Sequence, residues 1–166
     1  MVRRRDSIYK LASDFRDMIE DAIDNRVITD IYFSSFPRGC CGDTCDLLGQ
    51  YLLDHGIKTW NISGTYYSNY DEKIGTYIDS QSHAWLAMDN PQYTNDYIII
   101  DITGDQFDDR DSCGRYDIPV YVGKMDEFHG LFTINGYEVF DFGGIDSYIG
   151  PTSARLIRLY REIVGE

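Results

Sequence analysis

The feature that most constrains the fold is a pair of apolar segments separated by a polar turn. Residues 83–88 and 97–102 are rich in apolar and β-branched side chains, and residues 89–96 between them are polar. This pattern predicts two antiparallel strands joined as a hairpin. With the turn centred near its middle, His83 lies opposite Asp101. Both positions are odd-numbered, which places the two side chains on the same face of the sheet.

The rest of the chain predicts helices around this hairpin. The predicted helices cover about 7–25, 42–55 and 151–163, and the other predicted strands cover 57–63, 120–122 and 137–142, with a Tyr-rich loop or hairpin at 64–75. Asn135-Gly136 before the last strand is a hairpin signal. The fold class is therefore α+β, with N-terminal helices packed on a mostly antiparallel sheet and a C-terminal helix.

The length of 166 residues is enough for one domain with its own core. We expect a single domain, 1–166, that consists of three parts. These are an N-terminal helical segment (1–35), a core that carries the candidate site (36–122), and a C-terminal hairpin and helix (123–166).

The charge is strongly one-sided. The chain has 15 Lys and Arg against 28 Asp and Glu, which gives a net charge of −13. Such a surface repels nucleic acid and anionic membranes, and it favours a basic protein or peptide as partner. The arginine-rich start is followed by an amphipathic, acidic segment, so neither a signal peptide nor a membrane span is predicted. We expect a cytoplasmic protein, with export by a non-classical system left open.

The chain has four cysteines, Cys40, Cys41, Cys45 and Cys113. Their spacing argues against disulfides and favours reduced thiols. Cys40 and Cys41 lie just before a predicted helix, where unsatisfied N–H groups lower the pKa of a thiol. Cys41 is the favoured nucleophile because it is nearer the first turn and is followed by Gly42. Cys45 falls on the apolar face of the helix and is predicted to be buried, and Cys113 is predicted to be a surface thiol.

A cysteine, a histidine and an aspartate in this order suit a thiol-nucleophile site. Cys41 is the predicted nucleophile, His83 the base, and Asp101 the group that orients His83. Asp101 ends an apolar strand, where a carboxylate needs a partner. The alternative is a structural His83 and a solvent-facing Asp101.

Other residues have supporting roles in this interpretation. The candidate oxyanion donors are the backbone around Cys40 and Gly42, and the side chain of Gln106. Trp85, which alternates with His83, is the candidate substrate-binding residue. The two other histidines are assigned no chemistry: His55 ends a helix, and His129 lies in a predicted loop.

These residues together resemble the papain-like and transglutaminase-like cysteine enzymes. The resemblance covers about 36–122 and rests on the segments 36–48, 82–86 and 98–103. It is nearest to compact bacterial papain-fold domains, which include toxins that deamidate a host glutamine. It implies acyl transfer from a peptide bond or a glutamine side chain, without a cofactor. Gly42 replaces the aromatic residue that usually follows the nucleophile, and no glutamine precedes Cys41.

Three other interpretations remain open. The first is a non-catalytic protein-binding module on the same fold, which the acidic surface and the Tyr-rich segment 66–78 would suit. The second is a zinc site, although a second pair of thiols at zinc-finger spacing is lacking. The third is a calcium loop, which lacks the ordered ligand spacing of such loops. The zinc ligands would be Cys40, Cys41, Cys45 and His83, and the calcium ligands Asp105, Asp108, Asp109 and Asp111.

Overall fold

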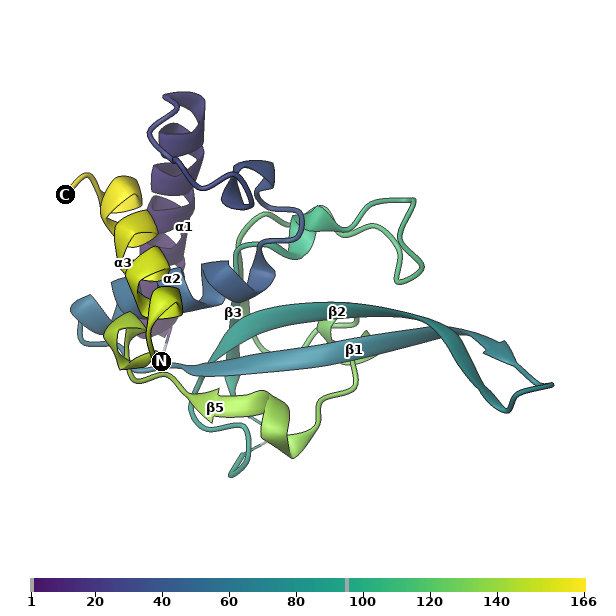
Figure 1. Cartoon of the computed structure of the whole chain (residues 1–166). Helices are drawn as coiled ribbons and strands as arrows, with labels where there is room; N and C mark the ends of the chain where they lie inside the picture. The colour runs from purple at the N-terminus through teal and green to yellow at the C-terminus, as the bar shows by residue number, and fades with distance from the viewer. Residues whose placement is uncertain (1, 95) are drawn as a thin grey trace.

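The computed structural model describes residues 2–94 and 96–166, and within them it has an α+β fold (Figure 1). The α-helices are α1 (Val2–Asp24), α2 (Cys41–Asp54) and α3 (Pro151–Val164). The strands are β1 (Trp60–Asp71), β2 (Thr76–Met88), β3 (Ile98–Asp101), β4 (Tyr121–Gly123) and β5 (Val139–Asp141). The short 3₁₀ helices are η1 (Phe33–Ser35), η2 (Gly104–Gln106), η3 (His129–Leu131), η4 (Gly136–Glu138) and η5 (Ile145–Ser147).

The strands form one sheet in the order β4-β3-β2-β1-β5, and every neighbouring pair is antiparallel. The prediction of an α+β chain with an antiparallel sheet is therefore confirmed. β1 and β2 are much longer than predicted, and they run out from the sheet as a projecting hairpin (Figure 1). For residues 64–75, the sequence left a loop and a hairpin as alternatives. The hairpin is confirmed, and the loop is wrong.

The register of the predicted hairpin 83–102 differs from the expected one by two residues. Leu86 pairs with Ile100, so His83 lies beyond the last pair of the β2–β3 ladder and is not directly opposite Asp101. His83 is also an interior residue of β2, which begins at Thr76. Because a shift of two residues keeps each side chain on its original face, His83 and Asp101 still share a face.

Alternation along β2 divides the core between the two faces of the sheet. Leu86 is buried among residues of the three α-helices, which cover one face (Figure 1). Trp85 is buried in a second cluster on the other face. This cluster, called the aromatic cluster below, contains Ile62, Trp85, Ala87, Tyr97, Ile99, Phe107, Phe128 and Phe132.

The C-terminal part differs most from expectation. The predicted strand 137–142 is only Val139–Asp141, and it pairs with β1, so the predicted C-terminal hairpin is wrong. Asn135 is instead the N-cap residue of η4 and forms a capping box with Glu138, which satisfies the backbone there without a hairpin turn. Across residues 2–94 and 96–166, no helix combines the length and apolar character needed to cross a bilayer.

Candidate active site

Cys41 is the first residue of α2, which begins one residue earlier than predicted. Its side chain is partly exposed, and the adjacent Gly42 is exposed. Burial raises the pKa of the Cys41 thiol, but a hydrogen bond with His83, the charge of that imidazole and the Ala84 backbone N–H together bring this pKa below its usual value. The site therefore favours a thiolate at Cys41.

The other cysteines lie in different surroundings. Cys40 is 2% exposed, its Sγ lies 3.4 Å from the backbone oxygen of Arg38, and burial raises its pKa to about 11. Burial also raises the pKa of Cys45, which packs in the core as predicted. Burial raises the pKa of Cys113 to about 11, and this side chain is only partly exposed. Geometry and electrostatics therefore both favour Cys41 over Cys40.

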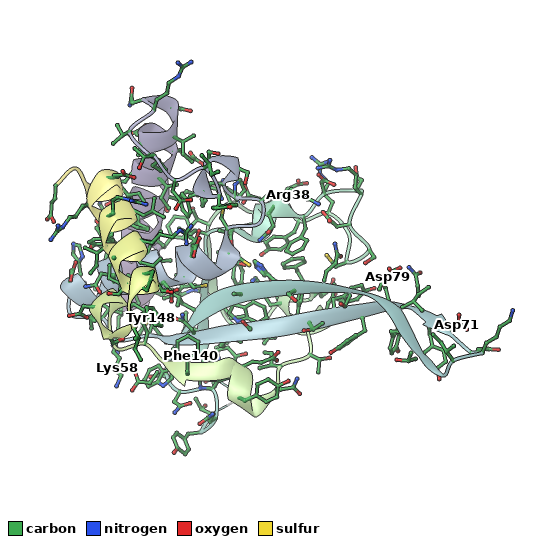
Figure 2. The ribbon with its side chains drawn as sticks, in the orientation of Figure 1. Arg38, Lys58, Asp71, Asp79, Phe140 and Tyr148 are labelled. Carbon is green, nitrogen blue, oxygen red and sulfur yellow. The ribbon has the colours of Figure 1, made fainter. Side chains whose placement is uncertain are left out.

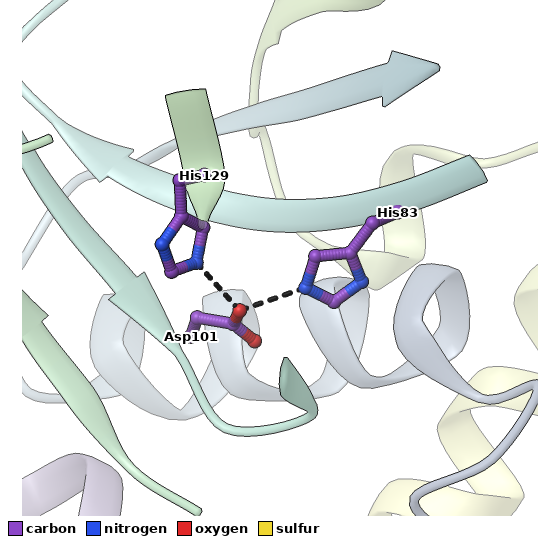
Figure 3. A group of neighbouring side chains, drawn as sticks. All are labelled: His83, Asp101 and His129. Atoms are coloured by element: carbon purple, nitrogen blue, oxygen red, sulfur yellow. Dashed lines mark hydrogen bonds and ion pairs between the residues drawn. The ribbon is translucent and has the colours of Figure 1, made fainter. Parts of the chain in front are cut away.

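His83 and Asp101 form the predicted pair in the interior (Figure 3). His83 Nε2 lies 2.7 Å from Asp101 Oδ2, and both residues are buried. Burial lowers the pKa of His83, but the Asp101 carboxylate and Cys41 raise it to about 9. Since Nε2 faces Asp101, Nδ1 is the ring nitrogen left for exchanging a proton with Cys41.

A second histidine, His129, joins this pair, which sequence reasoning missed. His129 Nε2 lies 2.8 Å from the same Asp101 oxygen (Figure 3), and His129 Nδ1 lies 2.6 Å from Asp126 Oδ1. His129 belongs to η3 and is fully buried, so its assignment to a loop without a role is wrong. The signal in the sequence was a histidine next to Phe128 and three residues after an aspartate. Burial raises the pKa of Asp101, but the two imidazoles bring it well below the usual range.

Gln106 reaches the site as predicted, but its amide is engaged there. Its Oε1 accepts the Gly39 backbone N–H at 3.2 Å, and its Nε2 donates to the Thr103 carbonyl at 3.1 Å. These two bonds fix the amide orientation and direct the other N–H at His83 Nδ1, 3.2 Å away. This contact suits a neutral His83 that is protonated at Nε2.

Two arginines hold the loops around the site. Arg38 binds the Asp111 carboxylate at 3.0 and 3.1 Å and donates to the Gln106 backbone oxygen, which joins the segment before Cys41 to the loop after β3. Arg16 of α1 binds both oxygens of Asp105 and donates to the Ile102 carbonyl. The position of Gln106 thus depends on bidentate ion pairs to both sides.

Trp85 does not line a surface. It is 0% exposed and packs against the rings of His83 and Phe132 at 5.6 and 5.9 Å. The prediction that Trp85 contacts substrate is wrong because the alternation of β2 directs it into the aromatic cluster. Its place beneath His83 makes it a support for the imidazole.

The predicted metal sets are not assembled. Within the described residues, the group able to hold a metal is His83, Asp101 and His129, which includes no cysteine. The zinc set is therefore wrong. The acids of the calcium set are paired with arginines: Asp105 with Arg16, Asp108 with Arg110, Asp109 with Arg115, and Asp111 with Arg38.

Comparison of this chain with protein-family models, curated proteins and solved structures finds no match.

Proposed function

We propose that this protein is a thiol-dependent acyl-transfer enzyme that acts on a carboxamide. The nucleophile is Cys41, the proton carrier is His83, and Asp101 orients His83. The observation that carries the proposal is the position of Cys41 at the first residue of a helix, beside an imidazole held by a buried carboxylate. This setting lowers the pKa of the Cys41 thiol. A structural cysteine in an apolar core has a raised pKa instead, as Cys45 does.

The reaction follows from these positions. The Cys41 thiolate attacks the carboxamide carbon, and the resulting oxyanion is stabilised by N–H groups at the start of α2. As the C–N bond breaks, His83 gives its Nδ1 proton to the leaving nitrogen, which departs as an amine or ammonia. The thioester on Cys41 then reacts with water or an amine, whose proton returns to His83. The product is hydrolysed, deamidated or crosslinked according to the substrate and acceptor.

Gln106 has two alternative partners in this scheme. Its N–H contacts Nδ1 when His83 is neutral. A proton on Nδ1 removes that acceptor, and this frees the Gln106 N–H to donate to the oxyanion. Gln106 thus serves as an oxyanion donor only in the charged state of the site.

The first test is iodoacetamide labelling as a function of pH, read by peptide mass spectrometry. Cys41 in the wild type should label with a pH midpoint well below about 8.5, and His83→Ala should raise that midpoint. His55→Ala is the matched control, because His55 lies exposed just after α2. Slow and similar labelling of all four cysteines would contradict the proposal. A positive result justifies screening basic peptides that contain glutamine.

The second candidate is a non-catalytic protein-binding module. It is favoured by the exposed apolar side chains on the β1–β2 hairpin, which projects beyond the sheet (Figure 2 marks Asp71 and Asp79 there). These side chains are Tyr67, Tyr70, Ile74, Tyr77 and Ile78. Exposed tyrosines are common in protein interfaces. Retention of partner binding by Cys41→Ala, with no turnover by the wild type, would favour this candidate.

A further inference from the structure

A cleft of about 270 Å³ lies beside the candidate nucleophile. Gly42 and Ala84, which directly follow Cys41 and His83 in the chain, both line it. Asn61 of β1 and Asp46 of α2 also line it. A side chain in this cleft would therefore belong to a substrate whose reacting group lies at Cys41.

Asn61, which lines the cleft, carries a buried hydrogen-bond acceptor without a partner. Asn61 is 6% exposed, and its Nδ2 donates to Asp46 Oδ1 at 3.0 Å. The amide orientation is fixed by that bond, and it leaves Asn61 Oδ1 buried with no hydrogen bond. An unsatisfied buried acceptor costs free energy, which a donor from a ligand would recover.

The carboxylate of Asp46, which accepts a hydrogen bond from Asn61, also lacks a positively charged partner among the residues that the structure describes. Asp46 Oδ1 accepts hydrogen bonds from Asn61 and from Tyr148 Oη at 2.6 Å, but Asp46 has no ion pair within the described residues. The other acid of the cleft, Asp43, differs because Arg155 binds both of its oxygens. The cleft thus offers acceptors and one free negative charge, and Phe140, 47% exposed, adds an apolar wall (Figure 2).

From this arrangement we infer that the cleft binds the ammonium or guanidinium group of a lysine or arginine side chain in the substrate. The cation pairs with Asp46, and its methylene groups pack on Phe140. Because Asn61 Oδ1 is buried, a small shift of the Asn61 side chain accompanies binding and lets the cation donate to this oxygen. The inference rests on the proposed function for its link to Cys41, and it names the substrate class as a basic peptide. The net charge of −13 favours the approach of such a peptide.

The first experiment measures binding without chemistry. n-Butylammonium and n-butanol, a cation and a neutral donor of equal chain length, are titrated into the ¹⁵N-labelled wild-type protein. The cation should give saturable shifts at the Asn61 side-chain amide and at the backbone amides of Gly42 and Ala84. Its affinity should exceed that of n-butanol by about tenfold, and Asp46→Asn should remove this preference. Asp141→Asn removes the same charge from β5 outside the cleft and should leave the preference unchanged.

Equal affinity for the two probes, or a preference that survives Asp46→Asn, would overturn the inference. These outcomes do not depend on a reactive Cys41, so they are distinct from failure of the labelling test.

A second experiment compares the rates at which Cys41 is alkylated by two chloroacetamides, one with an aminobutyl chain and one with an n-butyl chain. Faster reaction of the aminobutyl reagent, abolished in Asp46→Asn, is the expected result. Binding of free n-butylammonium without this acceleration would overturn the assignment to a substrate side chain and assign the cleft to an amine acceptor.

Discussion

Replacing Asp101 by asparagine tests the centre of the proposed site. The Asp101 oxygen that binds Thr103 N–H at 2.9 Å remains an oxygen in Asp101→Asn, because that position faces a donor. The new NH₂ group therefore takes the place of Oδ2, next to the Nε2 atoms of His83 and His129. An NH₂ group donates, so His83 Nε2 must become an acceptor and the ring proton moves to Nδ1. A neutral ring in that tautomer cannot accept a proton from Cys41.

The electrostatic effect can be estimated from the pKa of His83. Burial alone lowers this pKa, yet Asp101 and Cys41 raise it from 6.5 to about 9, which favours the imidazolium by about 3 kcal/mol. Without the carboxylate, burial dominates, and His83 is neutral at neutral pH. The pKa of Cys41 then rises toward the usual thiol value of about 8.5, and only about 3% of the thiol is ionised at about pH 7.

The assay is the pH midpoint of Cys41 alkylation between about pH 5 and about pH 10, with thiolate absorbance as a second readout. The midpoint is preferred to a single rate because a thiolate of higher pKa is a stronger nucleophile, which offsets part of the loss. Asp30→Asn is the control, since Asp30 is also buried but pairs with Arg155. Circular dichroism and thermal unfolding verify the fold of both variants. A folded Asp101→Asn protein whose Cys41 midpoint equals that of the wild type would refute the reasoning.

Three further predictions concern other parts of the site. Cys40→Ala should leave the Cys41 midpoint unchanged and cost about 1 kcal/mol of stability in urea titrations, because Cys40 fills the core. Activity that is lost in Cys40→Ala and retained in Cys41→Ala would instead transfer the nucleophile role to Cys40. Gly64→Ala should destabilise the protein by about 1–3 kcal/mol because its Cβ would lie 2.7 Å from Phe132 Cβ, whereas exposed Ser63→Ala should be nearly neutral. In Cys41→Ala, the free energy of unfolding should fall as pH rises above 6.5, because folded His83 beside Asp101 keeps a proton that the unfolded chain has released. The fall should be less than about 3 kcal/mol, because the variant lacks the Cys41 contacts that help raise the pKa of His83 to about 9. The wild type should show a shallower fall, because the lowered pKa of Cys41 acts in the opposite sense; equal slopes would argue against a coupled pair.

Local patterns predicted much of the fold and the chemistry. Helical periodicity located α2 and α3 closely, since caps and apolar spacing are local properties. Strand parity brought His83 and Asp101 to one face even though the register was wrong by two residues. The preference for Cys41 over Cys40 followed from its position at a helix start, which the structure supports with opposite pKa shifts.

The tertiary structure determined the residue pairings and the burial that depend on contacts between segments distant in the sequence. His129 meets Asp101 across 28 positions, and Asn61 meets Asp46 across 15, and neither pairing has a local signature. Trp85 was wrongly predicted to bind substrate, because strand alternation shows which side chains share a face of the sheet but not which residues cover that face. The sequence thus determined the residue types of the site and their strands and helix, because these depend on local propensity and periodicity. Burial, the second histidine and the cleft were determined only by packing, because they arise where separate elements exclude water together.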